Sequence, residues 1–221
     1  VLELGGKSPN IVFDDANIEE AVNWSYKSAF FNQGENCNAG TRLFLDRKIK
    51  ERFLKKFIKL TNETVVGDPF DNMSTMGPMI SRTHYDKVTG YINYGEENGY
   101  DLLAGGAEEL KLFDKGYFIS PTIFNNVPND SKLAQEEIFG PVLSIVEFDD
   151  VEDAIEKANN VIYGLAGSVH TTNLSKAHYL ARKLNVGNVW INCHGVADPT
   201  SPYGGRKLSG VGTEGGPQGI Y

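Results

Sequence analysis

Apolar positions along the chain follow two periodicities that predict an α/β fold. Short apolar runs bounded by glycine, proline or polar residues predict strands at 10–13, 43–45, 102–104, 142–148, 165–170 and 188–192, and a longer extended segment at 117–124. Apolar residues three or four positions apart predict helices at 18–30, 49–58, 83–97, 151–160 and 174–184. Single helices between strands imply right-handed crossovers. We therefore expect a mostly parallel open sheet flanked by helices.

The chain shows no internal repeat and no long linker, so we expect one continuous domain over 1–221. Its last part, 199–221, is rich in glycine and lacks a clear periodicity. Segments of this composition form loops, and functional loops are often built in this way. The tail is therefore expected to be loop-like.

Composition narrows the classes of partner. The 221 residues include 40% hydrophobic and 23% charged residues, as in ordinary globular proteins, and the net charge is −8. An acidic chain offers no basic face to nucleic acid or to anionic lipid. No apolar run reaches the roughly 18–20 residues of a membrane span, and the first residues lack the order of a signal peptide. We expect a cytoplasmic protein that binds neither nucleic acid nor membrane.

The two cysteines differ in their surroundings. Cys37 lies in a polar, glycine-flanked stretch, 32–42, which is an unusual setting for a structural cysteine and favours a reactive thiol. A cysteine that merely packs remains the alternative at this point. Cys193 follows the apolar segment 189–191, so burial is expected there. Two cysteines so far apart indicate neither a disulfide scaffold nor a zinc site, and no metal is expected.

Candidate partners for a reactive thiol are few in the sequence. None of the four histidines stands next to Cys37, so a cysteine–histidine hydrolase is an open but unsupported alternative. Glu3 precedes two glycines that let the backbone approach another group closely. Glu136 and Glu137 precede an aromatic residue and a strand, and only one of two such neighbours can point inward. Taken alone, these acids read as surface residues.

One glycine pattern is rejected as a nucleotide site. Residues 210–215 match the spacing of a dinucleotide-binding loop, but that spacing has meaning only between a strand and a helix. Only six residues follow it here. It therefore carries no cofactor prediction.

Several segments together resemble the aldehyde dehydrogenase superfamily, in its non-acylating, NAD(P)-dependent branch. They occur in the family's order and spacing across the whole chain, at 3–7, 33–37, 136–141, 163–166, 187–192 and 202–210. The resemblance implies that Cys37 attacks the aldehyde carbonyl and that its backbone N–H stabilises the oxyanion. It further implies that the resulting thiohemiacetal passes a hydride to the nicotinamide and becomes a thioester. Glu3 is then expected to activate the water that hydrolyses this thioester.

The same resemblance assigns cofactor and substrate residues. With NAD or NADP as cofactor, Glu137 is expected to bind the nicotinamide ribose, Phe139 to pack beside the cofactor, and Leu4 to lie near the nicotinamide ring. Asn192 and Tyr203 are expected to help wall the substrate tunnel. Asn36 and Asn38 flank the nucleophile and are expected to tune its specificity for substrate.

Members of this family are about twice as long, and their N-terminal half carries the nucleotide-binding domain. The resemblance therefore implies a truncated catalytic domain, with 1–6 as a remnant of the missing nucleotide-binding domain. We expect weak or no activity from the chain alone and a homo-oligomer in the full-length protein. Two alternatives stay open: a thiol esterase built on the same residues, and an inactive folding or assembly module.

Overall fold

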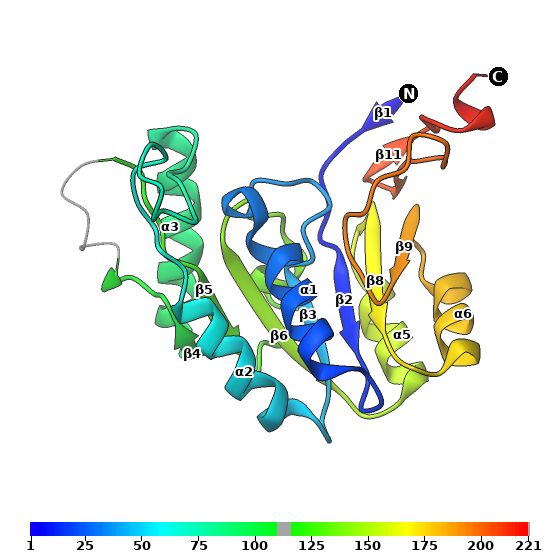
Figure 1. Ribbon diagram of the computed structural model, residues 1–221, viewed down its shortest axis with the longest axis horizontal. Helices are drawn as coiled ribbons and strands as arrows, with labels where there is room; N and C mark the ends of the chain where they lie inside the picture. The colour runs from blue at the N-terminus through cyan, green and yellow to red at the C-terminus, as the bar shows by residue number, and fades with distance from the viewer. Residues whose placement is uncertain (110–115, 221) are drawn as a thin grey trace.

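A seven-stranded sheet organises the chain in the computed structural model, which describes residues 1–109 and 116–220 (Figure 1). The strands lie in the order β4 (Asp101–Ala104), β5 (Thr122–Asn125), β6 (Val142–Phe148), β3 (Arg42–Asp46), β2 (Pro9–Val12), β8 (Ala166–His170) and β9 (Asn188–Ile191). Neighbouring strands pair in parallel except at the β4 edge, where β4 is antiparallel to β5. The predicted mostly parallel α/β fold is confirmed.

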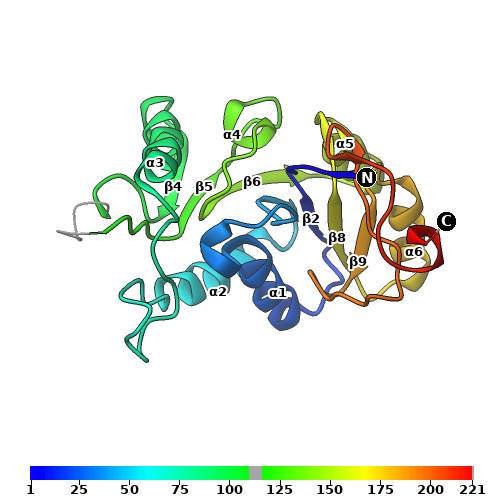
Figure 2. The same ribbon diagram turned by 90° about the horizontal axis from the view of Figure 1, so that it is seen from above.

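Helices cover both faces of this sheet (Figure 2). Within the described residues, the α-helices are α1 (Ile18–Phe30), α2 (Lys50–Asn62), α3 (Arg82–Glu97), α4 (Lys132–Gln135), α5 (Val151–Asn159) and α6 (Leu174–Lys183). One core cluster joins α1 and α2 to one face, and two others join α5 with α6, and α3 with α4, to the opposite side. Because both faces are covered, consecutive residues of β3 such as Leu43, Phe44 and Leu45 are all fully buried.

Of the predicted extended segment at 117–124, only the last part forms a strand of the sheet. Only β5, Thr122–Asn125, pairs with the sheet, and a short helix that the sequence did not indicate, α4, follows it. Pro121 stands directly before β5 and has no N–H to donate to a strand ladder. Tyr117 instead accepts a hydrogen bond from the backbone of Met79.

The glycine-rich tail is more ordered than expected. It contains β10 (Arg206–Lys207), β11 (Gly210–Val211) and a short 3₁₀-helix, η3 (Pro217–Gly219). β11 pairs with β1 (Leu2–Glu3), and β10 pairs with β7 (Tyr163–Gly164). The two ends of the chain therefore lie together beside the sheet (Figure 1).

A buried cation fixes the centre of the sheet. The Arg42 guanidinium, at the start of β3, is fully buried and donates to the backbone oxygens of Lys7 at 2.9 Å, Lys157 at 3.3 Å and Ala158 at 2.7 Å. Two of these carbonyls belong to the C-terminal turn of α5, where the helix dipole favours a positive charge. Arg42 thus ties the segment before β2 to α5.

Among the residues that the structure describes, no helix combines the length and the hydropathy needed to cross a membrane.

Two glycines of α3 give a matched test of the packing. A methyl group at Gly90 would meet open space, whereas one at Gly95 would overlap the buried ring of Phe124 on β5. We expect Gly90→Ala to raise the free energy of unfolding by about 0.5–1 kcal/mol through helix propensity. Gly95→Ala is expected to lower it by about 1–3 kcal/mol through overpacking. Urea unfolding of both variants measures the difference, and equal effects would contradict the described packing of α3 on β5.

Candidate active site

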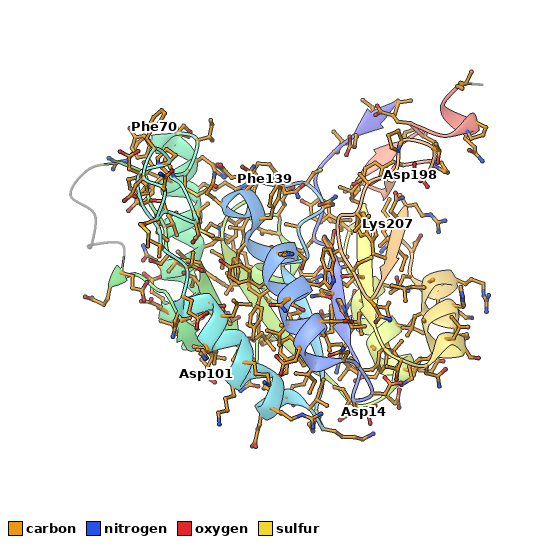
Figure 3. The ribbon with its side chains drawn as sticks, in the orientation of Figure 1. Asp14, Phe70, Asp101, Phe139, Asp198 and Lys207 are labelled. Carbon is orange, nitrogen blue, oxygen red and sulfur yellow. The ribbon has the colours of Figure 1, made fainter. Side chains whose placement is uncertain are left out.

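Several of the predicted site residues lie on segments that lead into the amino ends of parallel strands. Glu3 precedes β2, Cys37 precedes β3, and Phe139 precedes β6. The first residues of β2 and β3 are register partners, and β6 pairs alongside β3, so the three segments meet at one edge of the sheet. Figure 3 shows Phe139 at this edge and Asp14, which follows β2, at the opposite edge.

Cys37 and Glu3 are in direct contact. The Cys37 thiol donates to Glu3 Oε1 at 3.6 Å and also lies 3.8 Å from Asn36 Oδ1. Cys37 is half-buried, and the Glu3 carboxylate is exposed. A thiol and a carboxylate at this separation can exchange a proton without any other residue.

Burial raises the pKa of the Cys37 thiol above its ordinary value, and the negative charge of Glu3 raises it further. The backbone N–H groups of Asn38 and of Cys37 itself act in the opposite direction, because they favour the thiolate and lower the pKa. The thiol is therefore the main form at neutral pH, and the thiolate that acts as nucleophile is the minor form.

Two cavities meet at this pair. The first, of about 650 Å³, is lined by Cys37, Glu3 and Asn38 together with residues of β9 and of the tail, including Tyr203; we call it the tail cavity. The second, of about 440 Å³, is lined by Cys37, Glu3, Leu4, Gly5, His84, Lys87, Glu137 and Phe139; we call it the Glu137 cavity. Cys37 and Glu3 thus stand on a wall shared by two separate spaces.

The three residues expected to bind cofactor all line the Glu137 cavity. Glu137 Oε1 accepts a hydrogen bond from the Gly6 N–H at 3.2 Å, whereas Glu136 turns away and accepts from the Tyr91 hydroxyl at 2.6 Å. As expected, only one of these neighbouring acids points inward. Gly5 permits this arrangement because a methyl group there would overlap the Glu137 carboxylate.

The residues expected at the substrate tunnel are divided between different places. Asn38 and Tyr203 line the tail cavity and contact each other, with the Asn38 amide donating to the Tyr203 hydroxyl at 3.4 Å. Burial raises the pKa of Tyr203 to about 12, so its hydroxyl stays protonated. Asn36 does not line the tail cavity but a third cavity of about 400 Å³, against α1.

Asn192 is not at the tail cavity, which corrects the expectation for this residue. It is exposed, it has the left-handed backbone conformation with φ 56°, and it follows β9 at its far end. Its side-chain oxygen accepts from the Thr171 N–H and its amide donates to the Thr171 carbonyl, both at 3.0 Å. Both polar atoms are therefore committed to the backbone after β8.

Two residues of α3 belong to the site and were missed by the sequence reasoning. His84 contacts the Phe139 carbonyl through Nε2, and Lys87 Nζ donates to the Glu137 carbonyl at 3.0 Å. Phe139 has φ 62°, a left-handed conformation that is costly for a residue with a side chain, and the His84 contact holds it. His84 and Lys87 are three positions apart and lie on the same face of α3. The periodicity of apolar residues predicts the helix but does not indicate that its polar face contributes to a site.

The remaining sulfur and imidazole groups do not form a second site with Cys37. Cys193 is half-buried rather than fully buried, so the expectation of burial is only partly met. Over 1–109 and 116–220, the hydrogen-bond partners of the Cys37 side chain are Glu3 and Asn36, with no histidine among them. No group of three or more potential metal ligands converges within that part of the chain.

Comparison with known proteins agrees with this geometry. The family model for the aldehyde dehydrogenase family matches residues 1–221. The human mitochondrial aldehyde dehydrogenase is 45% identical over 219 residues, which are 99% of this chain and 42% of that protein. The betaine aldehyde dehydrogenase of Brucella melitensis biotype 2 is 44% identical over 216 residues, which are 97% of this chain and 44% of that protein.

Solved structures show the same similarity. The NAD⁺ complex of an aldehyde dehydrogenase from Bacillus cereus superposes with a TM-score of 0.94 at 42% identity, covering 99% of this chain and 44% of that one. The betaine aldehyde dehydrogenase of Staphylococcus aureus, solved with NAD⁺, gives 0.92 at 38% identity, covering 99% and 44%. The chain thus spans less than half the length of these relatives. Sequence and fold together show that the chain belongs to the aldehyde dehydrogenase family.

Proposed function

We propose that this chain supplies the nucleophile-bearing part of an enzyme that oxidises aldehydes to carboxylic acids with NAD⁺ or NADP⁺. The observation that carries the proposal is the contact of the Cys37 thiol with Glu3 Oε1 at 3.6 Å, on the wall between two cavities. Membership of the aldehyde dehydrogenase family supports it. The NAD⁺ complexes of the Bacillus cereus and Staphylococcus aureus enzymes support the choice of cofactor class.

The first step assigned to the chain is formation of a carbon–sulfur bond. Glu3 takes the thiol proton, and the Cys37 sulfur attacks the carbonyl carbon of an aldehyde held in the tail cavity. The carbonyl oxygen becomes an oxyanion, to which the Cys37 backbone N–H donates. Asn38 and Tyr203 line the space beside this centre and orient the rest of the aldehyde.

The residues of the Glu137 cavity fit a nicotinamide cofactor. The Glu137 carboxylate can accept hydrogen bonds from ribose hydroxyls, and Phe139 and Leu4 also line the cavity. Because Gly5 has no side chain, the Glu137 carboxylate has room to accept the hydrogen bond from the Gly6 N–H. NAD(P)⁺ bound there supplies the hydride acceptor.

The last step assigned to the chain is hydrolysis. Once the tetrahedral carbon has given up its hydride, Cys37 carries a thioester and Glu3 releases the proton of the thiol to solvent. The Glu3 carboxylate then takes a proton from the water that attacks the thioester and passes it to the sulfur as that sulfur leaves. The carbon–sulfur bond then breaks, the carboxylic acid leaves, and the thiol is restored. The exposed position of Glu3, at the junction of both cavities, supports access of water to this carboxylate.

We further propose that the chain by itself has weak or no dehydrogenase activity. The relatives are more than twice as long as the matched part. In the part of the chain that the structure describes, the glycine pattern at 210–215 forms β11 and a following turn, not a turn between a strand and an α-helix. An NAD(P)⁺ site complete enough for turnover therefore needs further residues.

Ester hydrolysis is a second candidate activity, because Cys37 and Glu3 are both in this chain and need no cofactor to form and cleave a thioester. An aryl ester should give a burst of phenol release followed by slow turnover. The burst should vanish in Cys37→Ala and persist in Cys193→Ser. A burst that survives in Cys37→Ala would contradict this activity.

Replacement of the nucleophile tests the main proposal. In the full-length protein that carries this chain, Cys37→Ser should reduce aldehyde-dependent NADH formation to background, because an alcohol beside Glu3 is a far weaker nucleophile than a thiol. The matched control is Cys193→Ser, which removes the other half-buried thiol and should retain activity. Unchanged NADH formation in Cys37→Ser would overturn the proposed function.

Replacement of Glu3 separates its two effects on Cys37. Because the carboxylate raises the pKa of the thiol, Glu3→Gln should lower that pKa, and iodoacetamide should then alkylate Cys37 about two- to tenfold faster at neutral pH. Hydrolysis should slow in the same variant, so that the thioester accumulates. Alkylation measured against pH checks the first effect, and intact-protein mass spectrometry checks the second. A slower alkylation at every pH would contradict the described contact.

A further inference from the structure

Three consecutive residues with left-handed backbone lie just before the nucleophile. Asn32, Gln33 and Gly34 have φ of 52°, 56° and 70°. Glutamine rarely adopts this conformation, and a run of three such residues persists only where surrounding contacts hold it. Cys37 follows the last of them by three residues. The position of its thiol therefore depends on what holds this turn.

Hydrogen bonds between Asn32 and Glu35 close the turn on itself. The Glu35 N–H donates to the Asn32 carbonyl and the Asn32 amide donates to the Glu35 carbonyl, both at 2.9 Å. Gly34 packs against the segment that leads into β6, since a methyl group at Gly34 would overlap the Gly140 carbonyl. The internal bonds keep the shape of the turn, but they do not fix its place relative to the rest of the molecule.

The Glu35 side chain joins the turn to α3. Its Oε1 accepts the Ile80 N–H at 3.1 Å, directly before Ser81, the N-cap residue of α3. The side chain of Glu35 is only 9% exposed, although it belongs to a connecting segment. Over residues 1–109 and 116–220, Glu35 is the member of the turn 32–35 whose side chain hydrogen-bonds to a residue outside the turn.

His84 lies beside the same carboxylate oxygen. Its Nε2 is 3.5 Å from Glu35 Oε1 and 2.5 Å from the Phe139 carbonyl oxygen. A carbonyl and a carboxylate can only accept, so Nε2 carries a hydrogen, and the shorter distance assigns that single hydrogen to Phe139. Glu35 therefore makes an electrostatic contact with the ring and takes its hydrogen bond from Ile80. The first turn of α3 thus holds both the turn before Cys37 and the segment of Phe139.

The contact between Cys37 and Glu3 depends on this attachment. It joins Sγ to Oε1 at 3.6 Å, and it is a contact between the ends of two side chains. Glu3 belongs to β1, which pairs with β11 and not with the segment of Cys37. A displacement of the turn would therefore carry the thiol away from the carboxylate while β1 stays where it is.

We propose that Glu35 is a positioning residue: its carboxylate fixes the left-handed turn to the start of α3 and thereby holds the Cys37 thiol in contact with Glu3. The inference rests on the proposed function for the role of Cys37 as nucleophile, but the contacts themselves do not depend on aldehyde chemistry. Glu35 is not among the residues that line the tail cavity or the Glu137 cavity. It acts through the position of the turn.

A double-mutant cycle in the full-length protein that carries this chain tests the role. Mass spectrometry of the peptide that contains Cys37 follows its alkylation by iodoacetamide at neutral pH, with glutamate or glutamine at position 3. We call the ratio of the two rates the Glu3 effect. It should be about two- to tenfold in the parent, because Glu3→Gln removes the charge beside the thiol. In Glu35→Ala it should fall below about 1.5-fold, because the thiol is no longer held at Glu3.

Matched variants separate positioning from charge and from general stability. The direct effect of the Glu35 charge on the thiol cancels in the ratio. Glu35→Gln keeps an oxygen that can accept from Ile80, so the Glu3 effect should return to the parental value. Glu97→Ala removes an exposed glutamate of α3 and should leave the Glu3 effect unchanged.

The outcomes that overturn the proposal are distinct. If Glu35→Ala lowers the midpoint of urea unfolding while the Glu3 effect keeps its parental value, Glu35 has only a structural role. A parent without any Glu3 effect has no contact for Glu35 to hold, which overturns the proposal as well. Should Glu35→Ala fail to fold, Ile80→Pro removes the donated N–H at a residue whose side chain is 80% exposed, and a parental Glu3 effect in that variant counts equally against the proposal.

Aldehyde-dependent NADH formation is measured separately on the same variants. If the parent forms no NADH while Glu35→Ala abolishes the Glu3 effect, the proposed function fails and the positioning role of Glu35 stands. If the parent forms NADH and the Glu3 effect persists in Glu35→Ala, only the positioning role fails.

Discussion

The buried guanidinium of Arg42 is the interaction on which the site depends. Arg42 begins β3 and gives all its described hydrogen bonds to backbone oxygens, two at the end of α5 and one at Lys7. Burial lowers its pKa to about 9, a measure of how poorly water reaches it. Breaking this contact would leave a cation and several carbonyls unpaired in the core, which is costly. The segment from Glu3 to β2 is thereby fixed beside the segment from Cys37 to β3.

This arrangement explains why the candidate site lies at the amino ends of the strands. Open α/β sheets usually bind ligands at the carboxyl ends of their strands. Here the segments that lead into β2, β3 and β6 carry Glu3, Cys37 and Glu137, and each is short enough to be fixed by the strand that follows it. The α3 helix closes the arrangement through His84, which holds the left-handed backbone of Phe139.

The sequence predicted the sheet and most of its helices because the strands are apolar on both faces and the long helices have clear apolar stripes. It failed at 117–124, where apolar residues pack without pairing, and at the tail, where two-residue strands leave no periodicity. For the site, motif resemblance placed Cys37, Glu3, Leu4, Glu137 and Phe139 around the same space. It misplaced Asn192, whose side chain is committed to Thr171, and it could not find His84, because the role of His84 arises from a contact between distant segments.

The pairing of β1 with β11 gives the two reacting groups unequal mechanical support. Glu3 is carried on a ribbon of two residue pairs, Leu2 with Val211 and Glu3 with Gly210, whereas Cys37 is followed within five residues by a central strand. Short, exposed ribbons open locally at a small fraction of the free energy needed for global unfolding. Warming below the global transition therefore frees the carboxylate while the thiol stays in place. Under the function proposed above, such an opening would leave Cys37 open to acylation while removing the carboxylate that activates water, so the thioester on Cys37 would accumulate.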